Sequence, residues 1–455
     1  MILLLLLFFL PFQTQWILRS GMLRGEQWQY GTIGIFAVDI LIVVLALIDG
    51  WKAFNDGGPK GILLLRKFGT IGWWIAALFA CILFSIVPSQ DKAVAWLHTF
   101  WVAEAIALGC IIAHATKDRL MRIAFCVGSV FQAFIGLWQF FTQSTIASSL
   151  LGVAAHPIWG GGTSVIEIAG ERWLRAYAGF PHPNFFGGYM AGAMVILVGL
   201  IVSETRIQAR RIFLGMLVVL SAGLAVSFSR SAMLAVGVGI TILALLSTLR
   251  HGRHTSLGQS EGKKLLLSFG IILISIITVL FPYRALFQTR VEHSTRLEQL
   301  SLNEREQQYA QAWELIRAQR WGRAAGYRGV TGIGNYTNAV SGRHPELPAW
   351  NIQPVHNAFV LMAAEIHGSS LIWVLLILYY CLKRALGITP LSSFKRHFWK
   401  QLRDPQSALP LALLGTLLLL LLFDHYLWSL HTGLLLWGTA FGFIVGDQKT
   451  LDNKE

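Results

Sequence analysis

Residues 184–203 read NFFGGYMAGAMVILVGLIVS and contain no charged side chain. An α-helix rises about 1.5 Å per residue, so a stretch of this length can cross the hydrocarbon core of a bilayer, which is roughly 30 Å thick. The same template fits eleven further apolar stretches. We therefore predict an all-α integral membrane protein with about twelve transmembrane helices, near residues 1–18, 31–50, 69–88, 94–114, 120–142, 184–203, 211–228, 231–249, 264–282, 356–381, 408–424 and 427–446.

The composition of the whole chain excludes a water-soluble protein. Of the 455 residues, 55% are hydrophobic and only 13% are charged, whereas soluble proteins carry about 25% charged residues. The mean hydropathy is +0.57. The first apolar stretch, MILLLLLFFLPF, lacks the basic start and the small-residue cleavage site of a secretory signal, which favours a retained helix. The four cysteines lie in or beside apolar stretches, so the sequence predicts neither a disulfide nor a cysteine-based metal site.

The distribution of basic residues predicts the orientation of the spans. The chain has 37 Lys and Arg against 23 Asp and Glu, a net charge of +14. Well over half of the Lys and Arg follow even-numbered spans, and such residues collect in cytoplasmic loops. Both termini are therefore expected in the cytoplasm, and the surplus charge does not require nucleic acid as a partner. The predicted division is five spans over 1–142, an outer loop over 143–183, spans six to nine over 184–282, a large outer loop over 283–355, and spans ten to twelve with a cytoplasmic tail over 356–455.

The large outer loop contains one regular pattern. Between Ser294 and Gln319, apolar residues recur at helical spacing among charged ones. This pattern predicts an amphipathic helix that lies on the membrane surface or caps the bundle. The stretch GYRGVTGIGNYTNAV over 326–340 is rich in glycine and is predicted to be irregular.

Residues suited to chemistry concentrate in the segments that this orientation puts outside. The loop over 143–183 leads into RAYAGFPHPNFF, the next outer turn reads SFSRSAM, span ten opens with PVHNAF, and the last outer turn reads FDHYLW. Because the orientation follows from loop charges alone, this coincidence predicts a functional site on the outer face. The candidate residues are Arg175, His182, Asn184, Arg230, His356, Asn357, Asp424 and His425.

Each candidate also has a purely structural interpretation. An arginine at a helix end often reaches phospholipid headgroups. The pairs His182–Asn184 and His356–Asn357 stand at natural helix starts, and Asp424 could pair with the adjacent histidine. These interpretations stay open for single residues, but they do not explain why two arginines and several histidines occupy the same side of the membrane.

The functional interpretation is group transfer from a diphosphate. The guanidinium fork matches phosphate geometry and stays charged, so Arg175 and Arg230 suit a lipid-linked diphosphate. A neutral histidine can act as general base, and nearby arginines would lower its pKa. The sequence contains no Asp-x-Asp pair, no H-E-x-x-H and no G-x-x-x-x-G-K-[ST]. It therefore predicts no metal, no cofactor and no ATP hydrolysis.

The ordered motifs RAYAGFPHPNFFGGYM, SFSRSAMLAVGVG, GVTGIGNY, PVHNAFVLMAAEIHGSSL and FDHYLWSLHTGLLLWGTAFGF resemble the O-antigen ligase and O-antigen polymerase superfamily over about residues 170–446. The resemblance implies a C-type membrane glycosyltransferase fold and metal-independent transfer of a glycan from undecaprenyl diphosphate to a glycan, lipid or protein acceptor. It implies that this reaction takes place at the outer face of the bacterial cytoplasmic membrane. Carried over to this chain, Arg175 and Arg230 bind the diphosphate and His356 is the base. Neither GITP (387–390) nor the rest of the loop after span ten distinguishes a polymerase from a ligase.

Two alternatives remain open at this stage. His182 competes with His356 for the role of base, because it also opens a helix at the outer face. The resemblance and the long neighbouring loop favour His356. The alternative function is a transporter or flippase of polyprenyl-linked glycans, for which Asp39 and Glu104, ionisable residues inside predicted spans, are the candidates. A structural membrane scaffold is a third possibility, and it leaves the outer candidates without a purpose.

Overall fold

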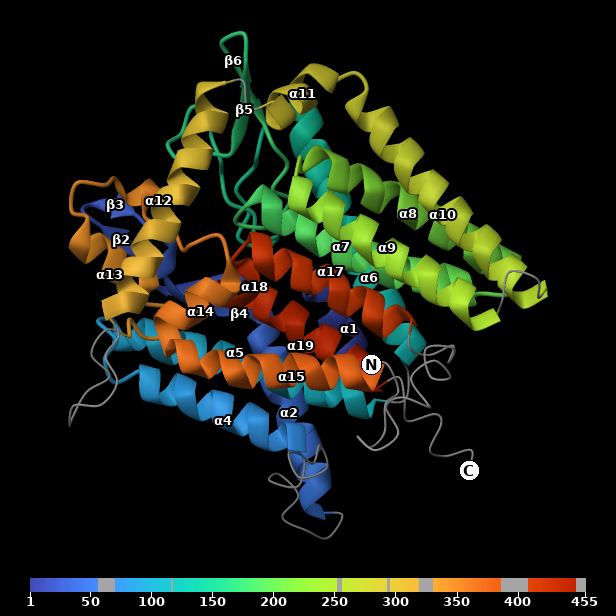
Figure 1. Cartoon of the computed structure of the whole chain (residues 1–455), viewed down its shortest axis with the longest axis horizontal. Coiled ribbons are helices and arrows are strands. Elements are labelled where there is room, and N and C mark those ends of the chain that lie inside the picture. The colour runs from blue at the N-terminus through green and yellow to red at the C-terminus, as the bar shows by residue number, and fades with distance from the viewer. Residues whose placement is uncertain are drawn as a thin grey trace.

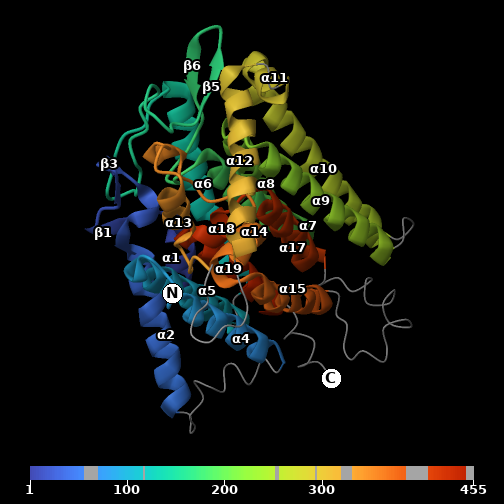
Figure 2. The same ribbon diagram turned by 60° about the vertical axis from the view of Figure 1, so that its left-hand side comes forward.

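The computed structural model describes residues 1–55, 70–115, 118–251, 256–292, 295–318, 330–385 and 408–446, and the account below concerns these residues. The described residues fold into a bundle of α-helices with three two-stranded antiparallel sheets, and the helices Arg284–Glu292 and Arg296–Ala318 lie around one end of the bundle (Figures 1 and 2). The loop after predicted span ten, including GITP, lies outside the described residues.

Six of the described helices are long and apolar enough to cross a membrane. Each matches one predicted span, because uninterrupted apolar sequence fixes a helix locally. This confirms the prediction of a helical membrane protein, whereas the count of about twelve spans stays a prediction. The six are α5 Lys92–His114, α6 Asp118–Thr142, α7 Pro183–Ser203, α8 Ile207–Val226, α9 Arg230–His251 and α10 Ser256–Leu280.

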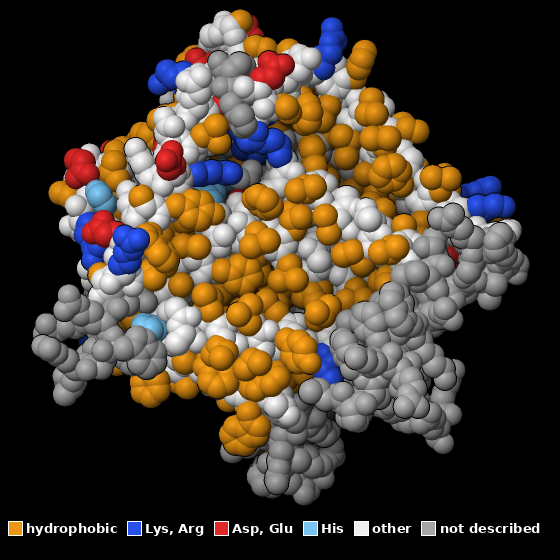
Figure 3. Space-filling model, viewed as in Figure 1, with side chains coloured by type: hydrophobic (Ala, Val, Ile, Leu, Met, Phe, Trp, Pro, Cys, Tyr) orange, Lys and Arg blue, Asp and Glu red, His pale blue; other side chains and the backbone are white. Residues whose placement is uncertain are grey.

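Further predicted spans correspond to shorter helices. These are α2 Ala37–Asn55, α4 Thr70–Ser85, α15 Leu371–Ala385, α17 Ala408–Phe423 and α19 His431–Gly446. Hydrophobic side chains cover the middle of the face in Figure 3, over α9, α15 and α17, as expected of a surface that meets lipid.

The first predicted span, 1–18, is wrong as a continuous helix. Helix α1 covers only Ile2–Phe9, about 12 Å of rise, and Pro11 follows. The chain then forms strand β1, Gln15–Arg19, which pairs antiparallel with β4, Ile33–Phe36. Strand β4 also replaces the start of the span predicted over 31–50. The apolar composition was read correctly, but the β-branched and aromatic residues Trp16, Ile17, Ile33, Ile35 and Phe36 favour strands there.

Two more hairpins correct the expectation of an all-α chain. Strands β2 (Met22–Leu23) and β3 (Glu26–Gln27) pair within the first segment, and β5 (Val165–Ile168) pairs with β6 (Glu171–Leu174) in the 143–183 loop. In both hairpins the two turn residues have positive φ, with glycine second. Such turns match the right-handed twist of the strands they join.

The predicted span 356–381 is also not continuous. Helix α14, Ala358–Ile366, is followed by His367 with φ 77° and by a 3-10 turn, η3 Gly368–Ser370, before α15 begins. Similarly, the last predicted span, 427–446, starts as the short helix α18, Tyr426–Ser429, and resumes as α19 after an extended Leu430. The second interruption closely follows Asp424 and His425.

The outer loop over 283–355 contains the predicted amphipathic helix. It is α12, Arg296–Ala318, preceded by α11, Arg284–Glu292. Helix α12 packs on α14 and so caps the bundle, one of the two predicted placements (Figure 2). In the glycine-rich stretch, 326–329 lie outside the described residues, and α13, Tyr336–Arg343, is a helix where an irregular segment was predicted; the 3-10 turn η2, Ala349–Asn351, follows.

Two packing arrangements position the functional site. Helix α7 is buried along almost its whole length among α6, α8, α9 and α17. Helices α5 and α19 approach so closely that a Cβ on Gly438 would lie 2.2 Å from the carbonyl oxygen of Ala105. Small residues allow such contacts between apolar helices, where dispersion rather than the hydrophobic effect holds the helices together.

Candidate functional site

A chain of hydrogen bonds connects three candidates from distant parts of the sequence. Arg175 Nη2 donates to Asn184 Oδ1 at 2.7 Å, and Asn184 Nδ2 donates to Asp424 Oδ2 at 3.1 Å. All three side chains are buried. The sequence predicted that these residues share one side of the protein, and the structure brings them into direct contact.

Local sequence explains how α7 presents Asn184. His182 is the N-cap of the helix, since its Nδ1 accepts from the backbone N–H of Asn184 at 3.1 Å, and Pro183 occupies the first turn. Gly188, one turn further, leaves room for Tyr426, whose hydroxyl would lie 1.9 Å from a Cβ at this position. The close approach lets α18 and the preceding turn lie against α7.

The turn between α17 and α18 carries the next two candidates. Asp424 follows the end of α17, and its Oδ1 accepts from the backbone N–H of His425 at 2.9 Å. The Nδ1 of His425 lies 2.6 Å from Ser429 Oγ, one helical turn on, and its Nε2 lies 3.9 Å from Asp424 Oδ1. The predicted local pair of Asp424 and His425 is therefore present as a contact, although both side chains also bind elsewhere.

His356 completes the cluster from the start of α14. Asn357 caps this helix, accepting from the backbone N–H groups of Phe359 at 3.0 Å and Val360 at 3.1 Å. The ring centroids of His356 and His425 are 5.4 Å apart. His356 Nδ1 lies 2.7 Å from Gln308 Oε1. A carbonyl oxygen only accepts, so Nδ1 carries the proton and Nε2 of the neutral ring is left as a base.

The electrostatics of the cluster keep its histidines neutral. Burial, with smaller effects of His425 and Arg305, lowers the pKa of His356 from 6.5 to about 3 against the opposing charge of Asp424. Burial likewise lowers the pKa of His182 and His425. Burial alone would raise the pKa of Asp424, but the three histidines and Arg305 lower it, so this carboxyl stays ionised. The sequence predicted a lowered pKa of His356, but it predicted the wrong cause: burial has the largest effect, and the arginine that contributes is Arg305, not Arg175 or Arg230.

The two predicted arginines differ in their surroundings. Arg175 is 3% exposed and donates to Ser227 O at 2.9 Å and Ser164 Oγ at 2.8 Å in addition to Asn184. Its guanidinium is thus bound by protein oxygens on three sides. Arg230, the first residue of α9, is half-buried and donates to the carbonyl oxygen of Arg290 on α11.

Arg305 on α12 is a residue that sequence reasoning missed. Its charge acts on Arg175, Arg230, His356, Asp424 and His425. Its Nε–H is buried and has no hydrogen-bond partner among the described residues. Arg305 precedes Gln308 by three positions, so both lie on one face of the helix. That spacing was a signal in the sequence, but only the contact of Gln308 with His356 shows which face matters.

Two groups of side chains in the described ranges could hold a metal ion. One is His356, Asp424 and His425, whose donor atoms all lie within 4.8 Å of one another. The other unites Asp39 and Glu104, the two residues singled out for the transporter alternative, with His431 of α19. No pattern in the sequence indicated that His431 joins them.

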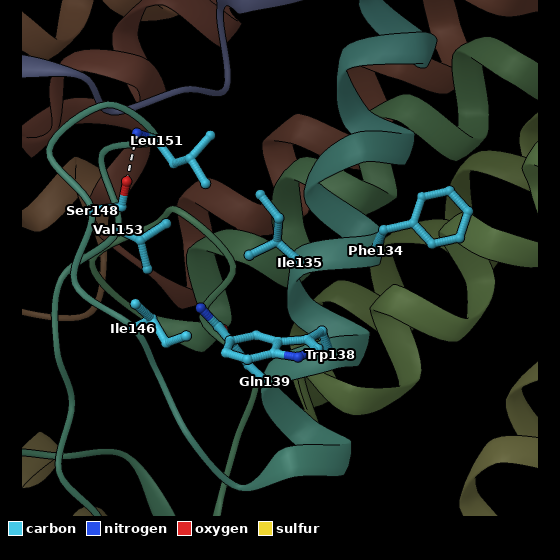
Figure 4. Close-up of a pocket in the computed structure, with 8 residues that line it drawn as sticks. All are labelled: Phe134, Ile135, Trp138, Gln139, Ile146, Ser148, Leu151 and Val153. Atoms are coloured by element: carbon cyan, nitrogen blue, oxygen red, sulfur yellow. Dashed lines mark hydrogen bonds between the residues drawn. The ribbon is translucent and has the colours of Figure 1, made fainter.

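An apolar groove of about 510 Å³ lies beside the C-terminal half of α6 and the segment that follows this helix (Figure 4). Gln139, in its wall, also holds the segment after Arg175, because Gln139 Nε2 donates to Ala178 O at 2.9 Å and Oε1 accepts from two backbone N–H groups. The groove is lined by Phe134, Ile135, Trp138, Gln139, Ile146, Ser148, Leu151 and Val153.

The long apolar helices and the polar cluster at their ends define a multi-pass membrane protein with a buried, histidine-containing site. Residues 215–366 match the family model described as O-antigen ligase. This match confirms the resemblance to the O-antigen ligase superfamily in that part of the chain, which contains Arg230, Arg305 and His356. The family implies a glycosyl-transferring membrane enzyme that acts on lipid-linked glycans. No curated protein matches the chain.

Proposed function

We propose that this protein transfers a glycan from an undecaprenyl-diphosphate-linked donor to an acceptor hydroxyl at the outer face of the bacterial cytoplasmic membrane, as a surface-polysaccharide ligase or polymerase. The observation that carries the proposal is the position of His356. Its unprotonated Nε2 belongs to a ring that Gln308 holds from α12 and that faces His425, and Arg305 of the matched family region is close enough for its charge to act on this ring.

The reaction needs a base and a neutralised leaving group. His356 Nε2 takes the proton of the acceptor hydroxyl as its oxygen attacks the anomeric carbon. The bond from that carbon to the diphosphate breaks, and the lipid diphosphate leaves with the electron pair. Arginine guanidinium groups bind the developing negative charge through paired N–H donors. The proton on His356 then passes to the diphosphate or to water, which restores the base.

Arg230 and Arg305 fit the role of diphosphate ligands better than Arg175. Each of the three guanidinium nitrogens of Arg175 already donates to a protein oxygen, and the side chain is almost fully buried. We therefore assign Arg175 a positioning role, in which it orients Asn184 and through it Asp424. Asp424 fixes His425 and balances the positive charges, while His182 and Asn357 support the helix starts.

The test is an assay with purified lipid-linked donor and acceptor. Replacing His356 by Ala should abolish transfer while donor binding persists. Arg305→Lys keeps the charge but loses the fork, so transfer should fall by about 10²-fold or more. Arg296→Lys, at an exposed position on the same helix, is the matched control and should transfer normally.

The same assay tests the predicted independence from metal. Wild-type transfer should persist in EDTA. If EDTA silences the enzyme without lowering its melting temperature and a divalent ion restores activity, the mechanism of base and arginines is wrong. If the Ala variant of His356 stays active while His182→Ala is inactive, the two histidines exchange roles.

A further inference from the structure

Three ionisable side chains meet in the interior, apart from the outer cluster. Asp39 lies in the first turn of α2, Glu104 lies in the middle of α5, and His431 opens α19. Their exposed fractions are 2%, 3% and 2%. They come from three helices that pack together, so the contact depends on the tertiary fold.

The donor atoms of these side chains converge on one point. His431 Nε2 lies 2.8 Å from Asp39 Oδ1 and 3.4 Å from Glu104 Oε2. Ligands bound tetrahedrally to Zn²⁺ at about 2.0–2.1 Å lie roughly 3.3 Å from one another. The 3.4 Å separation is close to this value, whereas 2.8 Å is the distance of a direct ion pair.

Hydrogen bonding leaves these atoms unsatisfied. Asp39 Oδ2 accepts from the backbone N–H of Phe36 at 2.7 Å. In contrast, Asp39 Oδ1, both oxygens of Glu104 and both ring nitrogens of His431 are buried and accept or donate no hydrogen bond within the described part of the chain, so that their contacts are the two ion pairs of His431 Nε2 given above. Buried carboxylates are normally paired, hydrogen-bonded or bound to a metal. The outer cluster differs, because Gln308, Ser429 and Asn184 bind its polar atoms.

Charge and surroundings also suit a cation. When the imidazole gives up its proton to bind a metal, the two carboxylates leave two negative charges, which one divalent ion cancels. Phe36 stacks on His431 with ring centroids 4.2 Å apart, and its backbone N–H fixes the carboxylate of Asp39. Such neighbours orient metal ligands and exclude water. One imidazole with carboxylate oxygens favours zinc or a similar first-row ion over calcium.

We propose that Asp39, Glu104 and His431 form a binding site for one divalent transition-metal ion of the zinc type. The ion joins α2, α5 and α19, and it is separate from the turn that carries Asp424 and His425. This site is structural and does not depend on the proposed transfer reaction, which takes place at a different cluster.

The test is the metal content of the full-length protein, purified in detergent after growth with added zinc. Wild type should carry about one ion per chain, and Asp39→Asn and Glu104→Gln should each carry at least about tenfold less. Glu365→Gln is the matched control, because this buried carboxylate already accepts from Trp428 Nε1 at 2.7 Å. It should keep the ion.

A second variant and a second measurement locate the ion. The Asp424→Asn variant should also retain about one ion per chain. If this variant loses the ion, the ion binds at the cluster of His356, Asp424 and His425, and the proposal is wrong. X-ray absorption of zinc-loaded wild type requires no variant to fold, and it should show one imidazole with oxygen ligands and no sulfur at about 2.0–2.1 Å. A wild-type protein without stoichiometric metal, or with a sulfur-containing shell, would refute the site.

Discussion

Asn184 Nδ2 donates to Asp424 Oδ2 at 3.1 Å, which joins the start of α7 to the α17–α18 turn across 240 positions of sequence. The other end of the same amide accepts from Arg175. A single neutral side chain thus connects a buried guanidinium to a buried carboxylate, and this link fixes the position of His425 beside His356.

Replacing Asn184 by Leu should destabilise the protein strongly. The change leaves the Arg175 guanidinium and the Asp424 carboxylate each short of one hydrogen bond in a buried place, at a combined cost of about 2–5 kcal/mol. The melting temperature in detergent should fall by several degrees. Thr142→Val is the control, because this exposed hydroxyl bonds only within its own helix. An unchanged melting temperature in the Leu variant would mean that the link contributes nothing.

Arg175→Lys and Arg305→Lys should separate stability from transfer. An ammonium cannot reproduce the three directed bonds of Arg175, so that variant should lose about 2–4 kcal/mol of stability. The Arg305 variant should keep its melting temperature and lose transfer. Thermal unfolding and the transfer assay, measured on the same preparations, distinguish the two roles. If the Arg175 variant instead loses transfer and keeps its melting temperature, Arg175 is the residue that binds the diphosphate.

Transfer should not decline where an ordinary histidine becomes protonated. Because the pKa of His356 is lowered to about 3, its base form persists from pH 8 to pH 5, and the rate should stay flat there. The same shift affects stability: the contribution of His356 is complete above pH 6.5 and decreases as pH falls toward 3, since only the unfolded state gains the proton. A rate that falls with a midpoint near pH 6.5 would show that the base has the ordinary pKa of histidine and would contradict this prediction.

Gln308→Leu tests how the base is held. Without the contact to Nδ1, the ring of His356 can rotate and can carry its proton on either nitrogen. The turnover number should therefore fall about tenfold, which is equivalent to about 1.4 kcal/mol. Donor affinity should change little. Gln307→Leu, at the exposed neighbouring position, is the control. Equal rates in both variants would show that Gln308 does not orient the base.

The orientation in the membrane can be tested with single cysteines on a background without the four natural ones. A cysteine at Gln307 on α12 should react with an impermeant reagent in intact cells. One at Gln208, exposed at the start of α8, should react only after the membrane is opened. Equal labelling of both would contradict the orientation inferred from loop charges.

The sequence by itself determined the long helices and several helix starts. Spans such as 184–203 follow from uninterrupted apolar residues, and the caps at His182 and Asn357 follow from neighbours within three positions. These are local effects, so a pattern in the chain is enough to predict them. The same local reading failed at 1–18 and 356–381, where pairing of β1 with β4 and the turn at His367 interrupt apolar sequence.

Only the tertiary structure decided which polar side chains act together. The sequence treated Arg175 and Arg230 alike, but packing gives each guanidinium nitrogen of Arg175 a protein oxygen as its acceptor. The fold also brought Arg305 to the outer cluster and His431 to Asp39 and Glu104. Hydrogen bonds and ion pairs are short-ranged and directional, so whether a buried polar group is satisfied depends on partners supplied by helices far away in the chain.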